Sequence, residues 1–422
     1  MMKKISNVNY TLHNNLCTGC GICESACPSH AIAIIVKNGE NIPYISEKFC
    51  NNNKGCHRCF DVCPGIGINL VEKAKFLYNE TNVKKDIYLG RYIKCYSGHS
   101  TDEYLRYHSA SGGMVSQFLI WLLENEKIDG AVVTRFDKES PLKVKTFIAK
   151  TREEIIASKS SKYGPVSFHT VINDLKHTAG ERFVIVGLPC HVAGIRKLAE
   201  KDKRLREKIV GVFSLYCSGT RTFNFTKYIL KNRCINIDKI DYLAYRDNGC
   251  LGGLVVKGEG IDYYEDYQRY SHPLRTIFYP RRCLLCADHF GELADICFGD
   301  IHIMPYSKDK TGINSVVVRN NYWDHLLYQS YQAGVITLEH LDEEILLKSQ
   351  KMAMIKKRRN MAFCLLNKKL GRDIPDYGTF YNAHIKIKDI VDYVRMSIER
   401  FIGRHKWCWF IIPVIKSKVH IH

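Results

Sequence analysis

Two short cysteine runs near the start of the chain restrict its fold more than any other feature. The first occupies residues 17–28 with the spacing C-x2-C-x2-C-x3-C-P, and the second, within residues 50–64, repeats the last three cysteines and the proline. In such runs three closely spaced thiolates bind three irons of one cubane, and the fourth thiolate crosses to the other cubane. We therefore expect two [4Fe-4S] clusters. The expected ligands are Cys17, Cys20, Cys23 and Cys63 for the first cluster, and Cys27, Cys50, Cys56 and Cys59 for the second.

The second run departs from the usual spacing at its first cysteine. Five residues separate Cys50 from Cys56, where two are usual, and the intervening Asn-Asn-Asn-Lys-Gly is turn-forming. We expect this insertion to loop out while Cys50 still reaches iron, since otherwise the second cluster would hold three irons or be labile. Short strands are expected over residues 31–36 and 66–71. Residues 1–75 are thus predicted to form an α+β, ferredoxin-like domain with two clusters.

Two other uses of these cysteines fit their pattern less well. Zinc sites use C-x2-C pairs, but rarely the full C-x2-C-x2-C-x3-C-P run and rarely twice. A disulfide framework suits short secreted chains, whereas this chain has 422 residues and begins with the polar Met-Met-Lys-Lys instead of an apolar signal core. Eighteen cysteines without such a signal indicate a cytoplasmic protein in a reducing compartment.

Residues 86–340 alternate between strand and helix patterns in the way that is typical of an α/β domain. The expected strands cover residues 128–133, 182–187 and 208–216, and the expected helices cover residues 110–123, 168–178 and 192–201. This order predicts a mainly parallel sheet with helices on both faces. Ligands of such sheets bind beyond the carboxyl ends of the strands, and Cys190 and Cys217 fall there.

A third set of cysteines is visible in this region. Cys283 and Cys286 form a C-x2-C pair, and together with Cys190 and Cys217 they provide four thiolates, enough for one more [4Fe-4S] cluster. The spacing alone also permits zinc, a dithiol or coincidence in a cysteine-rich chain. The remaining cysteines have no partner at ligand spacing, and most of them are expected to be small buried residues; they are Cys95, Cys234, Cys250, Cys297, Cys364 and Cys408.

Seven motifs that follow one another in order connect this region with a known family. They are Ser109-Ala-Ser111-Gly112-Gly113, Ser161-Lys162-Tyr163, Val186-Gly187-Leu-Pro189-Cys190-His-Val-Ala-Gly194, Cys217-Ser-Gly219, Tyr245-Arg246, Cys283-Leu-Leu-Cys286-Ala-Asp288 and Ala294-Asp295-Ile-Cys-Phe-Gly299-Asp300. Their succession resembles the beta subunit of coenzyme F420 (F-420) hydrogenases and dehydrogenases, in the branch with an N-terminal two-cluster ferredoxin domain. The resemblance covers roughly residues 10 to 340.

This resemblance implies both cofactors and chemistry. It places FAD in the α/β domain, beside a third cluster held by the cysteines that match Cys190, Cys217, Cys283 and Cys286. The flavin of the family exchanges a hydride with a deazaflavin, coenzyme F420, or with another small organic substrate, and some relatives occur among polysaccharide-assembly enzymes. The family usually has Gly-Thr-Pro-Cys where this chain has leucine at position 188. Because of this departure, the resemblance determines the identity of the substrate less well than the identity of the cofactor.

The residues around Ser111 and Lys162 are candidates for binding the cofactor. Ser111, Gly112 and Gly113 open a helix, whose free N–H groups and positive dipole end suit a phosphate or a flavin carbonyl. The alternative is a glycine-rich helix start without a ligand. Lys162 is placed to pair with the FAD pyrophosphate, although a lysine in a polar loop is more often simply solvated.

Four further residues are candidates for the site itself. Arg246 and Arg282 would steady the reduced flavin or neutralise a cluster. His191 follows the cluster cysteine and would donate a proton or hydrogen bond to the flavin, whereas a lone histidine is more often structural. Asp300 at a strand end binds a ribityl hydroxyl or marks only a turn. The chain has no G-x-G-x-x-G motif with a following acidic residue, so a Rossmann-type NAD site is not supported.

Residues 341–422 are predicted to form a helical, basic C-terminal tail. The formal net charge of the chain is +19, and from Lys348 onward 17 lysines and arginines face 5 acidic residues. Residues 387–402 have the pattern of an amphipathic helix, and tryptophan and phenylalanine follow among basic residues. Such a segment is typical of an interfacial anchor at the inner face of a membrane; the alternative is a helix packed on the domain. Nucleic-acid binding is not favoured, because no recognised binding motif is present.

Together these features predict an iron–sulfur flavoprotein oxidoreductase. Clusters carry electrons singly, while a flavin pairs them for hydride chemistry on a small molecule. A redox partner, either a ferredoxin or another oxidoreductase subunit, would exchange electrons with the N-terminal clusters. The alternative is an electron-transfer adaptor without a substrate of its own. A weaker third option is a structural iron–sulfur protein that binds nucleic acid.

Overall fold

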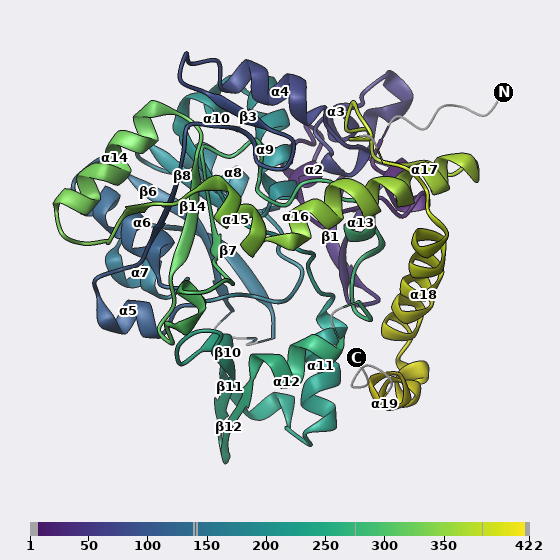
Figure 1. Cartoon of the computed structure of the whole chain (residues 1–422). Coiled ribbons are helices and arrows are strands. Elements are labelled where there is room, and N and C mark those ends of the chain that lie inside the picture. The colour runs from purple at the N-terminus through teal and green to yellow at the C-terminus, as the bar shows by residue number, and fades with distance from the viewer. Residues whose placement is uncertain (1–6, 138–139, 141, 275, 382, 418–422) are drawn as a thin grey trace.

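An eight-stranded mixed sheet forms the centre of the molecule in the computed structural model, which describes residues 7–137, 140, 142–274, 276–381 and 383–417 (Figure 1). From one edge to the other its strands are β15 (Glu339–His340), β5 (Lys94–Gly98), β14 (Asn314–Val318), β13 (Ile296–Asp300), β9 (Ile209–Leu215), β8 (Phe183–Gly187), β6 (Gly130–Phe136) and β7 (Val144–Ala149).

The four central strands, β13, β9, β8 and β6, run parallel to one another. The strands at both edges pair antiparallel, β7 with β6 on one side, and β14, β5 and β15 on the other. The parallel centre confirms the prediction from the alternation of strands and helices. The antiparallel edges were not predicted, because the sequence analysis assigned no strands to residues 86–100 and 314–340.

The two faces of the sheet are covered by different helices. Val132, Ile185 and Val212 point to the face covered by α8 (Val171–His177), α9 (Pro189–Lys201) and α10 (Lys203–Lys208). Their neighbours Val133, Val184 and Phe213 point to the opposite face, because successive strand residues alternate. The helices α6 (Met114–Glu124), α7 (Arg152–Ile156) and α14 (Asn321–Gln332) cover that face.

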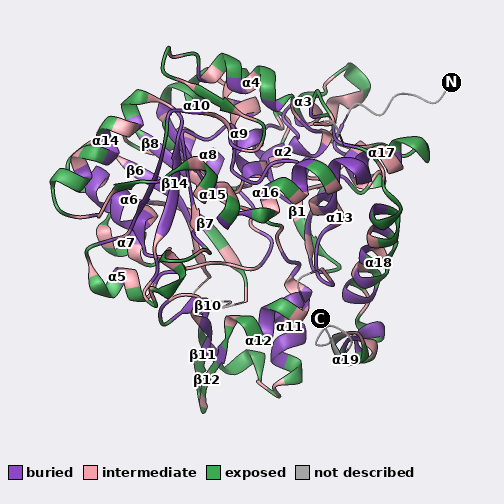
Figure 2. Cartoon of the chain, in the orientation of Figure 1, coloured by how far each residue is buried: buried purple, intermediate pink, exposed green. Residues whose placement is uncertain are grey.

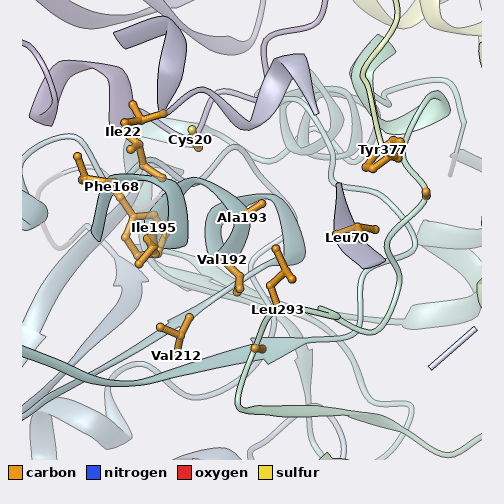
Figure 3. Packing of buried hydrophobic residues seen from close by; sticks show 14 of the residues in the cluster. Cys20, Ile22, Leu70, Phe168, Val192, Ala193, Ile195, Val212, Leu293 and Tyr377 are labelled. Atoms are coloured by element: carbon orange, nitrogen blue, oxygen red, sulfur yellow. The ribbon is translucent and has the colours of Figure 1, made fainter. Parts of the chain in front are cut away.

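The N-terminal cysteine region packs directly on the α8–α9 face. Its elements are α1 (Asn9–His13), α2 (Ile22–Ser25), β1 (Ile32–Lys37), β2 (Glu40–Ile45), η1 (Asn51–Lys54), α3 (Arg58–Asp61), η2 (Pro64–Ile66) and α4 (Leu70–Leu77). Ile22 shares one hydrophobic core with Phe168 and Ile195 of the α/β domain (Figure 3). The cysteine region is therefore built into the main core of the molecule.

One expected strand of this region is wrong. Residues 66–71 span the end of η2 and the start of α4 instead of forming a strand. The side chain of Asn69 accepts a hydrogen bond from the backbone N–H of Glu72 and caps α4, so the apolar residues that follow turn into a helix. The expected strand over residues 31–36 is confirmed as β1, which pairs antiparallel with β2.

A second, smaller sheet lies below the main one in Figure 1. Strands β10 (Ile240–Asp247), β11 (Gly253–Gly258) and β12 (Ile261–Asp266) pair antiparallel in that order. With α11 (Phe223–Asn232) and α12 (Tyr267–Ser271) they enclose a core of their own. The short helix α13 (Arg281–Leu284) then returns the chain to the cysteine region.

The C-terminal segment runs back across the molecule instead of projecting from it. Its elements are α15 (Glu343–Ser349), α16 (Lys351–Ile355), η6 (Lys356–Asn360), α17 (Met361–Lys369), α18 (Ile387–Arg404), η7 (Lys406–Ile411) and α19 (Ile412–Ser417). Met361, Phe363 and Met396 belong to the same core as Ile22. Within the described residues, no helix has the length and apolarity that crossing a membrane requires.

Candidate functional site

The first N-terminal group of cysteines lines a small hollow. Cys17, Cys20, Cys23 and Cys63 all border it. Burial raises the pKa of the Cys20 thiol to about 11, and the nearby Cys63 thiolate adds to the increase. Cys17 and Cys23 are raised for the same reasons, since each also faces the other thiolates of the group. These are the four cysteines predicted to hold the first cluster.

The second N-terminal group gathers around Cys59. Burial raises the pKa of this thiol to about 11, with further increases from the thiolates of Cys27, Cys50 and Cys56. Cys50 lies just before η1, so the insertion folds into a short turn of helix closed by Gly55 in the left-handed conformation (φ +86°). Cys50 thus lies close enough to Cys59 to affect its pKa, and its role as a ligand of the second cluster stays a prediction.

The surroundings of these thiols suit iron–sulfur clusters. The backbone N–H groups of Gly19 and Ala31 donate to the Sγ atoms of Cys17 and Cys27, at 3.4 and 3.3 Å. Among the described residues, no three or more His, Cys, Asp or Glu side chains are placed to hold a metal ion. The thiols of the first group surround a hollow instead, and a cubane binds each of its thiolates at a different iron.

The third set of cysteines is also brought together. Cys190 lies in the first turn of α9, Cys217 follows β9, and Cys283 and Cys286 lie in and after α13. Burial raises the pKa of the Cys190 thiol, and the thiolates that add to it are Cys217, Cys286, Cys20 and Cys283, in that order. Cys190 therefore faces both its own set and Cys20 of the first N-terminal group.

Two cations, Lys356 and Arg282, border this third set. The sequence did not indicate that they lie near each other. Lys356 is almost completely buried, and its Nζ lies 3.5 Å from the Sγ of Cys286. Burial opposes the charge of Lys356, but the thiolates of Cys286, Cys217 and Cys283 raise its pKa above the ordinary value. Burial likewise opposes ionisation of the Cys286 thiol, but Lys356 and Arg282 outweigh it and lower the pKa of that thiol.

Arg282 links the third set to the N-terminal region and does not line the cavity described next. Its Nε and Nη2 donate to the carbonyl oxygens of Gly65 and Pro64, at 3.1 and 3.2 Å. Its Nη1 donates to the hydroxyl of Tyr377 at 3.0 Å. Of the two roles considered for Arg282, this placement fits neutralisation of a cluster and not contact with a flavin.

A cavity of about 370 Å³ opens beside Cys217, at the carboxyl ends of the parallel strands. This volume is within the usual range for small-molecule sites. Six residues predicted for the site line it, with Cys217 from the third cysteine set; the six are Ser111, Gly113, Lys162, His191, Arg246 and Asp300. Gly112 is not among the lining residues, although it precedes Gly113 directly.

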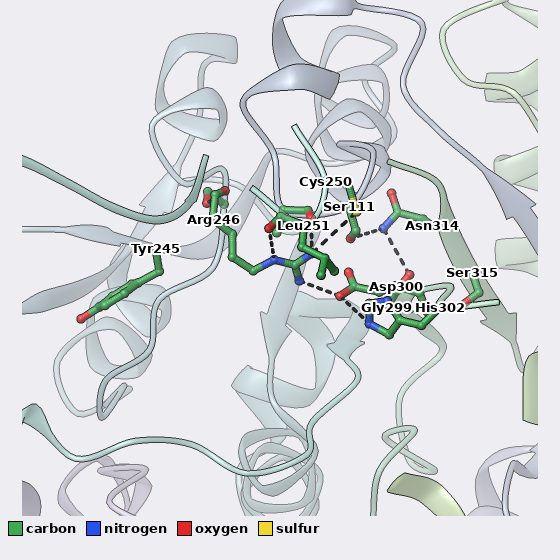
Figure 4. Close-up of polar contacts among 12 residues, drawn as sticks. Ser111, Tyr245, Arg246, Cys250, Leu251, Gly299, Asp300, His302, Asn314 and Ser315 are labelled. Atoms are coloured by element: carbon green, nitrogen blue, oxygen red, sulfur yellow. Dashed lines mark hydrogen bonds and ion pairs between the residues drawn. The ribbon is translucent and has the colours of Figure 1, made fainter. Parts of the chain in front are cut away.

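The buried Arg246 forms an ion pair with the half-buried Asp300 at the edge of this cavity (Figure 4). The Nη1 of Arg246 lies 2.6 Å from the Oδ2 of Asp300, and its other nitrogens donate to the carbonyl oxygens of Ala110 and Leu251. Burial opposes ionisation of Asp300, but Arg246 and His302 lower its pKa below the ordinary value. The pair is therefore ionised and rigidly held.

His191 has both ring nitrogens engaged within the protein. Its Nδ1 accepts a hydrogen bond from the backbone N–H of Leu188 at 3.1 Å. Burial lowers its pKa to about 4, although a hydrogen bond with the backbone of Val166 opposes the change. His191 is thus a neutral imidazole that caps the start of α9. This geometry favours the structural role over proton donation.

Lys162 and Arg221 give the cavity a positive character. The Nζ of Lys162 binds only carbonyl oxygens, among them those of Lys159 at 2.6 Å and Ser160 at 3.0 Å. Burial, with a smaller contribution from Lys159, lowers its pKa to about 7. Arg221 stacks on Tyr279 at 4.3 Å, and its buried Nε has no hydrogen-bond partner among the described residues. Asp300 is the one acidic residue among those that line the cavity.

The glycines at the start of α6 fix where that helix begins. Gly113 is its N-terminal cap in the left-handed conformation (φ +73°), so the helix starts at Met114, four residues later than expected. The Oγ of Ser111 accepts a hydrogen bond from Asn314 at 2.9 Å, which joins this turn to β14. Ser111 and Gly113 face the cavity, but α6 itself contributes mainly buried apolar residues to the core.

The fold and the cysteine groups agree with what family models find in this chain. Residues 16–65 match the model of a 4Fe-4S dicluster domain. The chain thus belongs to the class of 4Fe-4S iron–sulfur proteins. Residues 95–173 and 180–344 match the N-terminal and C-terminal models of the coenzyme F420 hydrogenase/dehydrogenase beta subunit. The chain belongs to this family.

Curated relatives carry related names. The chain is 24% identical to a coenzyme F420-dependent sulfite reductase of Methanocaldococcus jannaschii, over 93% of this chain and 64% of that protein. It is 26% identical to a coenzyme F420 hydrogenase subunit beta of Methanococcus voltae, over 68% of this chain and 99% of that subunit. The match thus spans about two thirds of the reductase and nearly the whole hydrogenase subunit.

One solved structure supports the fold. A chain of the F420-reducing [NiFe] hydrogenase complex from Methanosarcina barkeri superposes with a TM-score of 0.55 and 20% identity. The superposition covers 69% of this chain and 98% of that one. The shared part is the family fold, and about a third of the present chain lies beyond it.

Proposed function

We propose that this chain is an iron–sulfur flavoprotein oxidoreductase of the reducing cytoplasm. It would hold two [4Fe-4S] clusters in the N-terminal region, a third between Cys190, Cys217, Cys283 and Cys286, and FAD in the cavity. When bound, the clusters would pass single electrons and the flavin would pair them for hydride exchange with coenzyme F420 or another small organic substrate.

The observation that carries this proposal is the position of Cys217. This residue belongs to the third cysteine set and also lines the cavity. On the other side of the same set, Cys190 faces Cys20 of the first N-terminal group. Cys23 of the first N-terminal group in turn faces Cys59 of the second. This order of neighbours supports an electron path from the N-terminal region to the cavity.

The cavity lining fits an anionic, partly aromatic ligand such as FAD. Among the described residues, no carboxylate pairs with Lys162 or Arg221, so the pyrophosphate of FAD would compensate these charges. Tyr163, Tyr267 and Tyr279 add aromatic surface to the lining. Arg246, already neutralised by Asp300, would hold the shape of the site, and His191 would fix the turn before Cys190.

Counting the cofactors tests this proposal. Anaerobic purification should yield about twelve irons, as many sulfides and one FAD per chain. Cys190→Ser should remove about four irons and leave the N-terminal clusters in place. Cys95→Ser is the matched control, because this buried cysteine lies in β5 and belongs to none of the three groups. Four irons or fewer without a flavin spectrum would refute the proposal, and loss of all iron in Cys190→Ser would refute the grouping.

The second candidate is an electron-transfer subunit without a substrate of its own. Two of the similar proteins are a hydrogenase subunit and a chain of a hydrogenase complex, which favours a redox partner protein for this chain as well. Oxidation of reduced F420 by the isolated chain with a dye as acceptor separates the two candidates. Turnover of reduced F420 would support the enzyme. Reduction of the clusters by a partner protein, without any turnover of F420, would support the electron-transfer subunit. A part in polysaccharide assembly rests on the family resemblance alone.

A further inference from the structure

Helix α18 turns an apolar stripe to solvent. Ile387, Val391, Val394, Ile398 and Phe401 are exposed by 83%, 60%, 51%, 56% and 52%. Residues spaced by three and four fall on one face of a helix, so these five side chains form a continuous row along α18. Figure 2 shows exposed and buried residues alternating along this helix at the edge of the molecule.

The opposite face of α18 is already used for packing. Tyr393 and Met396 are buried in the main core, and Ile402 is buried in the core of the small sheet. The buried face also carries Asp389 and Glu399, which a core-facing side would normally lack. Surface helices usually turn their apolar stripe inward and their polar residues outward. In α18 the more apolar face is left outside.

The segment after α18 continues this apolar surface. Trp407, Phe410 and Val414 are exposed by 69%, 75% and 60%. The ring of Trp407 lies 6.1 Å from that of Phe401, so the two parts of the surface meet. Trp409 and Ile412 alternate with the exposed residues and are buried against the small sheet, which holds η7 and α19 in place.

The charge around this apolar surface has one sign. Lys386, Lys388, Arg404 and Lys406 are exposed beside it. The acidic residues of α18 are turned to basic partners of the protein. Asp389 pairs with Arg358, and Asp392 and Glu399 pair with Arg395. The free charge that a partner would meet is therefore positive.

We propose that the face formed by α18, η7 and α19 docks on a membrane surface that contains anionic phospholipids. The helix would lie in the plane of the interface with its apolar row among the acyl chains, the tryptophan at the boundary and the lysines at the headgroups. A row of aliphatic and aromatic residues bordered by cations of one sign matches a lipid surface, because it combines apolar burial with attraction to anionic headgroups. The proposal is independent of the cofactors, and α18 lies beyond the family models, which end at residue 344.

Vesicle sedimentation of the full chain tests this proposal. The chain should sediment with vesicles of phosphatidylglycerol and phosphatidylcholine and remain in solution with phosphatidylcholine alone. Lys388→Glu and Lys406→Glu should each weaken binding by at least about fivefold, as expected for a basic residue near an anionic surface. Equal sedimentation with both kinds of vesicle would overturn the anionic-lipid assignment.

Substitutions at a matched pair of phenylalanines distinguish specific membrane binding by this surface from nonspecific hydrophobic adsorption. Phe410 and Phe76 are exposed by 75% and 76%, and Phe76 lies on α4 in the N-terminal region. Phe410→Glu should lower binding at least tenfold, whereas Phe76→Glu should leave it unchanged, with the circular dichroism of both variants like that of the parent. Equal effects would overturn the proposal. The parent chain could instead form a dimer without lipid and fail to bind vesicles. If Ile398→Glu then converts this dimer to a monomer, the membrane proposal is overturned, and the surface binds a second copy of the chain.

Discussion

All eight N-terminal cysteines lie within residues 17–63, whereas the third cysteine set is spread over residues 190–286 and takes a cation from Lys356. Each N-terminal group takes three thiols from one short loop, where local spacing brings them together, and the fourth from the other loop nearby in the chain. The third set and the adjoining cavity exist only once α9, β9, α13 and the C-terminal segment have packed. Loss of a long-range contact should therefore disturb the third set and the cavity first, and the N-terminal groups last.

The largest expected effect comes from the ion pair at the edge of the cavity. Within the described part of the chain, Arg246→Met leaves Asp300 with only His302 as an ion-pair partner. Since the Asp300 side chain is still 19% exposed, the expected loss is about 3 kcal/mol, the lower end of the range for breaking a buried pair. Urea unfolding followed by fluorescence would measure this loss. Arg182→Met breaks an exposed pair with Asp129 and should change stability little. Equal losses in the two variants would show that the cavity does not depend on this contact.

The next effect concerns the cation beside the third set. Lys356→Met removes a buried positive charge 3.5 Å from the Sγ of Cys286. The reduction potential of the proposed third cluster should fall by on the order of 100 mV, because the cation favours the added electron. A redox titration followed by EPR would measure it.

Lys197 provides the comparison in the N-terminal region. Its Nζ donates to the carbonyl oxygen of Cys63 at 3.0 Å and not to a sulfur. Lys197→Met should therefore shift the potential of the first cluster less than Lys356→Met shifts that of the third. The reverse order would contradict the contrast between the two regions.

A pH dependence should be specific to the cavity. The pKa of Lys162 is lowered to about 7 by burial, so this lysine loses its proton as the pH rises above 7. An anionic ligand binds the protonated form, and the affinity for FAD, the proposed ligand, should therefore fall above pH 7, by at most about tenfold per pH unit. Titration of the FAD-free protein by fluorescence would measure this slope. Lys162→Arg keeps the charge and should remove the slope; an unchanged slope would place the titrating group elsewhere.

The smallest effect is expected in the loop that carries Cys50. Gly55 has φ +86° and open space around the position of a Cβ, so Gly55→Ala should cost about 1 kcal/mol through backbone strain alone. Thermal unfolding would measure this cost. The iron content should stay unchanged, since no side chain is displaced. Loss of iron in this variant would show that the insertion itself positions the second cluster.

The difference between the locally formed N-terminal groups and the third set, which depends on long-range packing, explains what the sequence could and could not predict. The cysteine runs and the parallel centre of the sheet follow from local spacing, and Cys50 lies close to Cys59 as expected. The spacing alone did not decide whether the third set binds a cluster, because one C-x2-C pair does not reveal that α9 and β9 approach it. Lys356 and Arg221 were missed, since neither lies in a motif. The basic tail was expected as a separate part, but its apolar residues Met361 and Phe363 complete the main core.

Arg282 has a consequence for how the two regions work together. Its guanidinium spans from the carbonyl groups of Pro64 and Gly65 to the turn that carries Cys283 and Cys286. Any separation of these neighbourhoods would break charge-assisted hydrogen bonds inside the protein. Unlike a ferredoxin that docks and leaves, the N-terminal cysteine region is held in place by hydrogen bonds within the same chain. With the proposed clusters bound, the distance between the first and the third would therefore stay constant, and only the encounter with an outside redox partner would vary.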